Sequence, residues 1–231
     1  MGTRSPAAQD GGGGAYGRGR RRLACLAVAT ARRPQLRKVF VLGCAAPQRA
    51  QAQTERRLTG RRQTGRVRLL LIADTHLPGR ARDLPAQVWA EVAAADLVVH
   101  AGDWVSADLL DRLEQRSAAL LGCWGNNDGP DLRHRLPEVA RATVEGVRLA
   151  VVHETGSRAG RERRADLAHP GTDLLVFGHS HIPWDTVTPG GMRLLNPGSP
   201  TDRRRQPSCT YLTAQLLHGA VTDVVLHSPT L

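Results

Sequence analysis

Short apolar runs separated by polar turns organise the chain from Val67 onward. The first run, from Val67 to Ala73, is interrupted only by Arg68, which is typical of a strand buried on both faces. Further runs of this kind predict strands at residues 97–100, 120–124, 147–152, 174–177, 184–188, 193–195, 209–215 and 221–226.

Three segments predict helices instead. Residues 85–95 and 108–115 carry apolar side chains at helical spacing, and the charged segment 160–167 is expected to form a surface helix. Strands and helices alternate in the first half, whereas the second half is rich in strands, with turn signals at residues 189–191 and 217–219. Strand-rich halves packed face to face with flanking helices predict an α/β sandwich.

Charge divides the chain into two regions. Residues 1–66 hold 15 Lys and Arg against two acidic residues, whereas residues 67–231 hold 17 against 19. The formal net charge of +11 therefore belongs to the extension. A basic, Gly- and Arg-rich segment buries too little apolar surface to fold, so we expect residues 1–66 to be disordered and residues 67–231 to form one domain.

The extension leaves two interpretations open. The chain contains a single lysine, Lys38, among 31 arginines, as GC-rich coding produces, and translation starting at Val67 would remove the whole segment. If the extension is real, its charge could bind nucleic acid. Cys123 and Cys209 lie in separate apolar runs and are expected to be buried thiols in a reducing cytoplasm, and no stretch is long enough for a membrane span.

Polar residues with metal-binding chemistry follow the predicted strands. The segments are Asp74-Thr75-His76, Gly102-Asp103, Gly125-Asn126-Asn127-Asp128, Val152-His153, Gly178-His179-Ser180-His181 and Asn196-Pro197-Gly198-Ser199. The first five each lie where an apolar run ends, so a fold that aligns strand ends would bring their side chains together. In extended backbone residues i and i+2 point to the same side, which would pair Asp74 with His76 and His179 with His181.

Carboxylate, carboxamide and imidazole ligands without thiolate suit manganese, iron, cobalt or zinc. Two cations roughly 3.5–4 Å apart can hold a phosphate, lower the pKa of a water and stabilise the charge that develops in an in-line displacement. Hydrolysis of phosphoesters is the reaction that needs all three effects.

These segments, in this order, resemble the calcineurin-like metallophosphoesterase superfamily, in particular its small single-domain bacterial and archaeal phosphodiesterase branch. The resemblance spans about Val67 to Leu231 and implies a four-layer sandwich of two mixed β-sheets flanked by helices. It also implies two divalent metal ions, manganese first, with nickel, cobalt, iron or zinc as alternatives. The implied ligands are Asp74, His76 and His181 on the first metal, Asp103 bridging, and Asn126, His153 and His179 on the second, and we assign Asp103, Asn126 and His179 to catalysis.

One position departs from the family pattern. Many members have a histidine where this chain has Asn127, and a carboxamide cannot donate a proton to a leaving group. General-acid help is worth typically about 10²–10⁴-fold, so we expect either a preference for good leaving groups or a proton donor supplied by water or the substrate.

Three further residues are expected around the site. Asp128 either orients a ligand histidine or caps a turn, and Asn196 shapes the pocket. Arg203, in the run Arg203 to Arg205, either binds a phosphate or belongs to a solvated basic loop.

The sequence thus predicts a metal-dependent enzyme that hydrolyses small phosphoesters, diesters in preference to monoesters. The alternative is a non-catalytic scaffold or interaction module, because a eukaryotic retromer subunit shares this fold. A homo-oligomer is compatible with the sequence.

Overall fold

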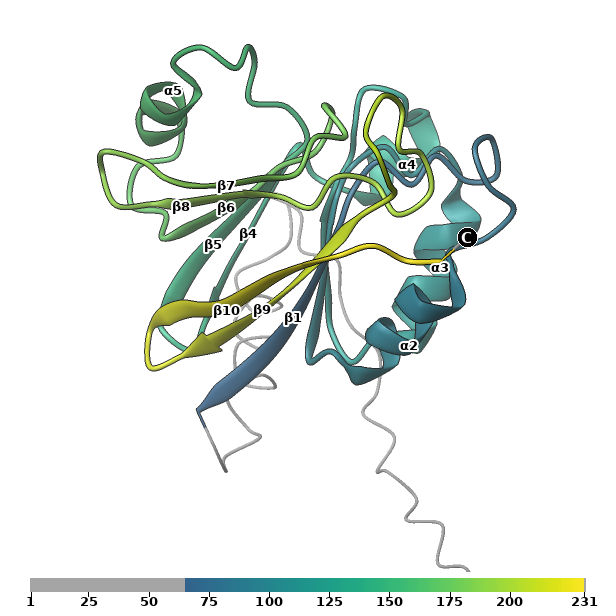
Figure 1. The fold of residues 1–231 in the computed structure, drawn as a ribbon, viewed down its shortest axis with the longest axis horizontal. Helices are drawn as coiled ribbons and strands as arrows, with labels where there is room; N and C mark the ends of the chain where they lie inside the picture. The colour runs from purple at the N-terminus through teal and green to yellow at the C-terminus, as the bar shows by residue number, and fades with distance from the viewer. Residues whose placement is uncertain (1–64, 231) are drawn as a thin grey trace, which may run out of the picture. The chain divides into compact units, whose positions relative to one another are not determined.

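The computed structural model describes residues 65–230, so the expectations for the extension up to residue 64 lie outside the described residues. Two five-stranded sheets form the centre of this domain (Figure 1), in the orders β10-β9-β1-β2-β3 and β4-β5-β6-β8-β7. The strands are β1 (Arg66–Ile72), β2 (Leu97–Ala101), β3 (Leu120–Cys123), β4 (Val139–Val144), β5 (Val147–Val152), β6 (Leu174–Val176), β7 (Trp184–Val187), β8 (Arg193–Asn196), β9 (Tyr211–Leu217) and β10 (Ala220–His227). The helices are α2 (Ala86–Ala94), α3 (Ala107–Arg116), α4 (Pro130–Arg135) and α5 (Arg161–Ala168).

Both sheets are mixed. In the first, β1, β2 and β3 run parallel, with Leu69 opposite Leu97, and β9 and β10 continue the sheet antiparallel. In the second, β5, β6 and β8 run parallel, whereas β4 and β7 are antiparallel to their neighbours. The carboxyl ends of the parallel strands in each sheet therefore share one edge of that sheet.

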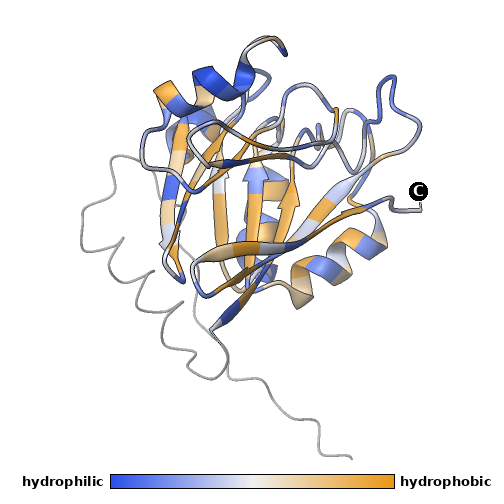
Figure 2. Ribbon diagram, turned by 60° about the vertical axis from the view of Figure 1, so that its left-hand side comes forward, coloured by the Kyte–Doolittle hydropathy of each residue, from blue (hydrophilic) through white to orange (hydrophobic). Residues whose placement is uncertain are grey.

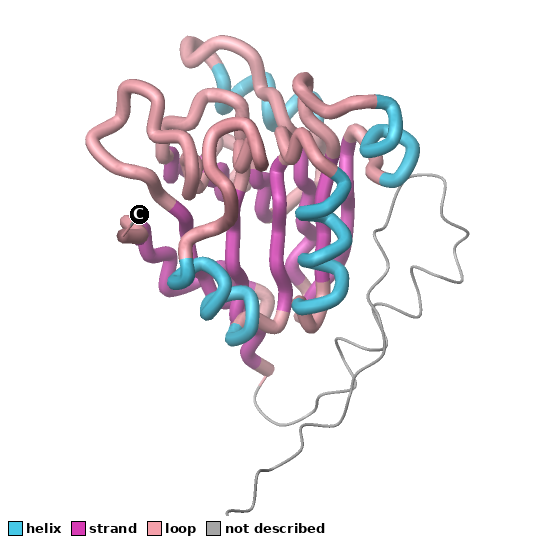
Figure 3. Tube along the Cα trace, turned by 90° about the vertical axis from the view of Figure 1, so that its right-hand side faces the viewer, coloured by secondary structure: helices cyan, strands magenta, loops and turns pink. Residues whose placement is uncertain are grey.

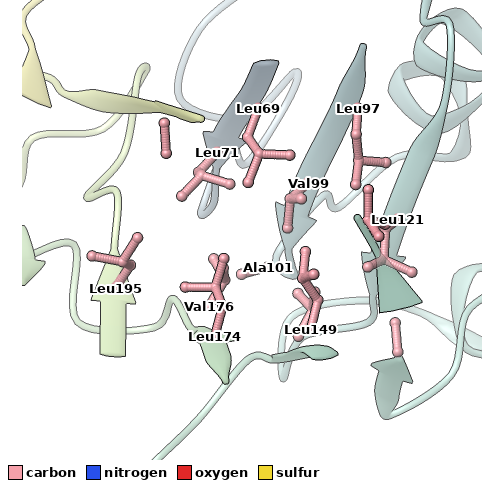
Figure 4. Close-up of a cluster of buried hydrophobic side chains, with 14 of the residues drawn as sticks. Leu69, Leu71, Leu97, Val99, Ala101, Leu121, Leu149, Leu174, Val176 and Leu195 are labelled. Carbon is pink, nitrogen blue, oxygen red and sulfur yellow. The ribbon is translucent and has the colours of Figure 1, made fainter. Parts of the chain in front are cut away.

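Side chains alternate between two cores along β1. Leu69 and Leu71 point between the sheets, where they join a cluster that includes Leu149, Val176 and Leu195 of the second sheet (Figure 4). In Figure 2 the hydrophobic residues concentrate on the strands, whereas the loops are mostly hydrophilic. Because β1 is buried on both faces, its sequence shows no alternation of apolar and polar residues.

Helices cover the outer face of each sheet. Leu70 and Ile72 pack with Val88 of α2 and Leu110 of α3, and Ala165 of α5 joins a separate cluster on the second sheet. The layers are helix, sheet, sheet and helix, so the predicted four-layer α/β sandwich is confirmed. Figure 3 shows the long loops gathered along one edge of the sheets.

Two elements were not predicted. Helix α4 has six residues and buries only Leu132, so its sequence carries no apolar period. Strand β4 lies at the edge of its sheet and buries only Ala140 and Val144, so its alternation is weak. Among residues 65–230, none of the helices has the length and apolar composition needed to cross a bilayer.

Candidate metal centre

Loops that follow six strands supply the candidate site. Asp74 and His76 follow β1, Asp103 follows β2 and Asn126 follows β3. From the second sheet, His153 follows β5, His179 and His181 follow β6, and Asn196 ends β8. The carboxyl ends of parallel strands are the usual place for a ligand site in open sheets, and here the two sheets contribute jointly.

Three of the seven predicted ligand side chains form a first group. His76 Nε2 lies 3.2 Å from His181 Nε2, and His181 Nε2 lies 3.5 Å from Asp74 Oδ1. One ligand atom from each of these three residues lies within 4.8 Å of the others. All three side chains are buried.

A second group forms around Asn126. Its Oδ1 lies 2.9 Å from His153 Nε2 and 2.9 Å from His179 Nδ1. The two imidazole nitrogens lie 3.3 Å apart. His153 is buried, whereas the side chain of His179 is 43% exposed, so this group opens to solvent.

Asp103 lies between the two groups. Its Oδ2 is 3.5 Å from His76 Nε2 and 3.4 Å from His153 Nε2. The structure thus brings together all seven side chains that the sequence singled out as ligands, in two groups that share one carboxylate.

Several atoms in the centre fit a divalent cation. His181 Nδ1 lies 2.6 Å from Asp202 O and His153 Nδ1 lies 2.9 Å from Ala101 O, so each ring donates its Nδ1–H to a carbonyl and turns the Nε2 lone pair inward. Asp74 Oδ2 is buried and meets no protein hydrogen-bond partner among the described residues. Inward lone pairs beside an orphaned carboxylate oxygen are the donor set that a cation would use.

Burial shifts the pKa values of several side chains in the centre. Burial raises the pKa of Asp74 to about 7 and, together with the negative charge of Asp103, outweighs the lowering by His153 and Arg204. Burial also lowers the pKa of His181 to about 4. For Asp103 burial raises the pKa, but the neighbouring His153 imidazole and hydrogen bonds from Asn127 outweigh burial, so the pKa is lowered. The centre therefore contains one carboxylate held in its charged form and a second whose charged form is disfavoured by burial.

Five of the seven side chains extend from left-handed backbone. The φ angles are 54° at Asp74, 45° at His76, 59° at Asp103, 69° at His179 and 58° at His181. The extended geometry assumed for the two i, i+2 pairs is therefore wrong, and the members of the second pair join different groups. Non-glycine residues in this region cost of order 1–3 kcal/mol each and cluster at functional sites.

Neighbouring backbone packs tightly against Asp103. A Cβ atom at Gly125 would lie 2.2 Å from Asp103 Oδ1 and 2.3 Å from its backbone nitrogen, so only glycine fits there. On the other side of the centre, Ser199 Oγ donates to Asp74 O at 2.7 Å and Thr201 Oγ1 donates to Thr75 O at 2.7 Å.

Asp128 supports the loops and does not contact a histidine ring. Its Oδ2 accepts from the backbone N–H groups of Gly125 (2.7 Å) and Asp103 (3.1 Å), and its Oδ1 accepts from Val105 N (2.7 Å). Of the two roles expected for Asp128, the structure shows the turn-capping one.

Asn127 and Asn196 fix other parts of the site. Asn127 donates from its backbone to Asp103 Oδ1 (2.9 Å) and from its side chain to Asp103 Oδ2 (2.7 Å). Asn196 donates to Gly178 O (2.8 Å) and accepts from Gly198 N (2.8 Å), which positions the loop that carries His179.

Within the loop 203–205, the arginine that contacts a candidate ligand residue is Arg204, not Arg203. Arg203 donates to Gln206 O at 2.9 Å within its own loop, whereas Arg204 Nη1 donates to His179 O at 3.1 Å. Sequence reasoning also missed Arg133, which donates to Asn126 O at 3.2 Å. Only the proximity of these arginines to the strand-end motifs could have indicated them.

Comparisons with known proteins agree with this geometry. The family model described as a calcineurin-like phosphoesterase superfamily domain matches residues 67–219. A probable metallophosphoesterase of Methanothermobacter thermautotrophicus is 36% identical over 149 residues, which is 62% of this chain and 83% of the relative. The solution structure of a Thermotoga maritima protein is 33% identical, with a TM-score of 0.56, and covers 70% of this chain and 99% of its own. The structure of a novel archaeal phosphodiesterase, 16% identical, has a TM-score of 0.52 over 69% of this chain and 99% of its own, and shows similarity of fold alone.

Proposed function

The chain belongs to the calcineurin-like phosphoesterase superfamily, and we propose that it hydrolyses phosphodiester bonds at a centre that binds two divalent cations. The observation that carries this proposal is the position of Asp103, whose Oδ2 lies 3.5 Å from His76 Nε2 in one group and 3.4 Å from His153 Nε2 in the other. Asp74 also lies close to Asp103 and His153, so the two groups are contiguous. A single cation would need only one of the groups.

We assign Asp74, His76 and His181 to one cation, Asn126, His153 and His179 to the other, and Asp103 to both. Bound there, the cations would supply Lewis acidity and an activated water, as in other two-metal sites. The mixed oxygen and nitrogen donors suit several divalent metals, and the family resemblance places manganese first, with nickel, cobalt, iron or zinc as alternatives.

The chain's own residues prepare the site. Two hydrogen bonds from Asn127 orient the Asp103 carboxylate and hold it in its charged form. Arg204, anchored on His179 O, is exposed at the rim and has further N–H groups that can bind a phosphoryl oxygen.

Charge bears on the preference for diesters, and Asn127 bears on the preferred leaving group. A diester carries one negative charge at its phosphorus, whereas a monoester carries up to two, and Arg204 is the one arginine that contacts a candidate ligand of the second group from the loop 203–205. Because Asn127 cannot donate a proton, esters with good leaving groups should react fastest. The archaeal phosphodiesterase of the same fold is consistent with this preference.

The decisive experiment uses the full chain stripped of metal. Hydrolysis of bis(4-nitrophenyl) phosphate and of 4-nitrophenyl phosphate would be measured after restoring manganese, nickel, cobalt, zinc or magnesium, together with metal binding by calorimetry. Asp103→Asn should abolish the metal-restored activity, whereas Asp131→Asn, an exposed position on α4, should retain it. Metal binding without hydrolysis of either ester would favour the scaffold alternative instead.

We also retain the cytoplasm as the proposed compartment. Cys123 and Cys209 are both buried and unpaired, which suits a reducing environment.

A further inference from the structure

A group of arginines surrounds Trp184 beside the candidate metal centre. Arg158 and Arg161 place their guanidinium carbons 5.2 Å and 4.8 Å from the centroid of the Trp184 ring, and Arg161 also lies 4.8 Å from the Phe177 centroid. We call Arg158, Arg161 and Arg164 the arginine cluster. It comes from the loop after β5 and the first turn of α5.

Arg161 is a buried cation without a matching anion. The residue is 7% exposed and its Nε–H is buried without an acceptor. Within residues 65–230 its guanidinium makes a single hydrogen bond, from Nη2 to Gly156 O at 3.3 Å. The carboxylate next in sequence, Glu162, accepts a hydrogen bond from Thr186 Oγ1. Burial lowers the pKa of Arg161 and outweighs the opposing effect of the Glu162 charge, while the positive charges of Arg164 and Arg158 add to the lowering.

Ring stacking does not account for this arrangement. Aromatic rings attract the face of a guanidinium, but its N–H groups point outward in the plane and still require acceptors. An orphaned donor on a buried charge is costly and calls for an explanation, of which an anion supplied by a ligand is one.

The loop that carries Arg158 is held in place. Arg164 donates to the carbonyl oxygens of Ala159 (2.7 Å), Thr155 (3.3 Å) and Ser157. Because Arg164 binds three carbonyl oxygens of this loop, it holds the loop and the other two arginines of the cluster in position before a ligand binds.

The cluster lies at the same edge of the second sheet as the metal centre. Trp184 begins β7 opposite Asn196, at the carboxyl end of the parallel strand β8. Trp184 follows His181 by three residues, so their Cα atoms are at most about 11 Å apart. A small substrate that reaches the centre could therefore also reach the cluster.

We propose that Arg158 and Arg161 bind a second anionic group of the substrate, remote from the phosphorus that is attacked. This inference rests on the proposed function and narrows its substrate class to phosphodiesters that carry a further phosphate or carboxylate. Arginine suits either oxyanion, because its fork of N–H donors matches both.

The test uses chromogenic diesters that differ only in a remote charge. Alkyl 4-nitrophenyl phosphates with spacers of two, four and six carbons would end in a hydroxyl, a carboxylate or a phosphate, and kcat/KM would be measured with the manganese-loaded full chain. We expect a preference of about tenfold or more for an anionic end at one spacer length, the size expected for hydrogen bonds to a charged group. The favoured end distinguishes phosphate from carboxylate.

Arg158→Gln and Arg161→Gln should each reduce this ratio toward one. Arg163→Gln is the matched control, because Arg163 is exposed on the same helix and is not part of the cluster, so it should keep the wild-type ratio. Arg158 is exposed, so its variant stays informative even if Arg161→Gln unfolds. A ratio near one in the wild type at every spacer length, or an equal loss in Arg163→Gln, would overturn the inference.

A binding measurement separates this inference from the proposed function. The full chain, with no metal added, would be titrated with butane-1,4-diol bisphosphate while tryptophan fluorescence is recorded. A change that is lost in Arg158→Gln and in Trp184→Phe supports the subsite even if no ester is hydrolysed, whereas an unchanged spectrum in the wild type refutes it. Loss of all esterase activity, by contrast, bears on the metal centre.

Discussion

Replacing Asp128 by alanine should destabilise the fold through three backbone groups. The side chain is buried, at 3% exposure, and it accepts hydrogen bonds from Gly125, Asp103 and Val105. A buried donor left without a partner costs about 1–3 kcal/mol, so three would cost about 3–9 kcal/mol if all stayed dry. Val105 is 40% exposed and water can satisfy its N–H, so two dry donors remain and the expected loss is about 2–6 kcal/mol.

Urea unfolding followed by circular dichroism of the full chain measures this loss. The midpoint should fall while the slope with denaturant stays constant, because the surface exposed on unfolding does not change. Asp128→Asn keeps one oxygen acceptor and should lose about half as much, and Asp131→Ala, exposed on α4, should lose less than about 1 kcal/mol. A loss below about 1 kcal/mol in Asp128→Ala would refute the capping argument.

Three further changes test other parts of the structure. Asn127→His should raise kcat on alkyl phosphodiesters more than on aryl ones, by about tenfold or more, because imidazole can protonate a poor leaving group; equal effects on both would contradict this. Gly178→Ala should lower the melting temperature and weaken metal binding measured by calorimetry, since its Cβ would lie 2.7 Å from Ala101 O, and retention of both properties would count against it. Hydrogen bonds from Arg148 lower the pKa of Asp173, so this pair stabilises the protein above the carboxyl's unfolded pKa and loses that contribution as pH falls. Asp173→Asn should therefore lower the free energy of unfolding, measured with urea, by less than about 1 kcal/mol at pH 7 and by still less at pH 3. A larger loss at pH 3 than at pH 7 would contradict the expected pH dependence.

The sequence was most informative for segments in which a single requirement, such as burial or metal binding, determines the residue types. Burial between two layers requires a continuous apolar run, and this made β1 recognisable. The strand-end motifs were equally clear, because a two-metal centre requires particular donor atoms, and His153 and Asp103 lie together although 50 residues separate them.

Other features depend on contacts that local sequence does not encode. Asp74 and His76 adopt left-handed φ angles, which are uncommon for non-glycine residues even though aspartate and histidine accept them more readily than most, so local sequence does not specify them. Arg203 and Arg204 are chemically identical neighbours, and the left-handed turn at Arg204 (φ 46°) decides which one reaches His179. Asp128 could have accepted a hydrogen bond from a histidine ring or from backbone N–H groups. It accepts from the backbone because two loops meet at its side chain.

The division of the ligands between the two sheets has a consequence for biosynthesis. Asp74 to Asn126 emerge from the ribosome well before His179 and His181, and β1 pairs with β9, so that Leu71 lies opposite Leu212. No nascent fragment could therefore complete the proposed two-cation centre until nearly the whole domain has been synthesised. Metal binding would then occur only after the complete α/β sandwich has formed, and truncated chains would not hydrolyse phosphoesters.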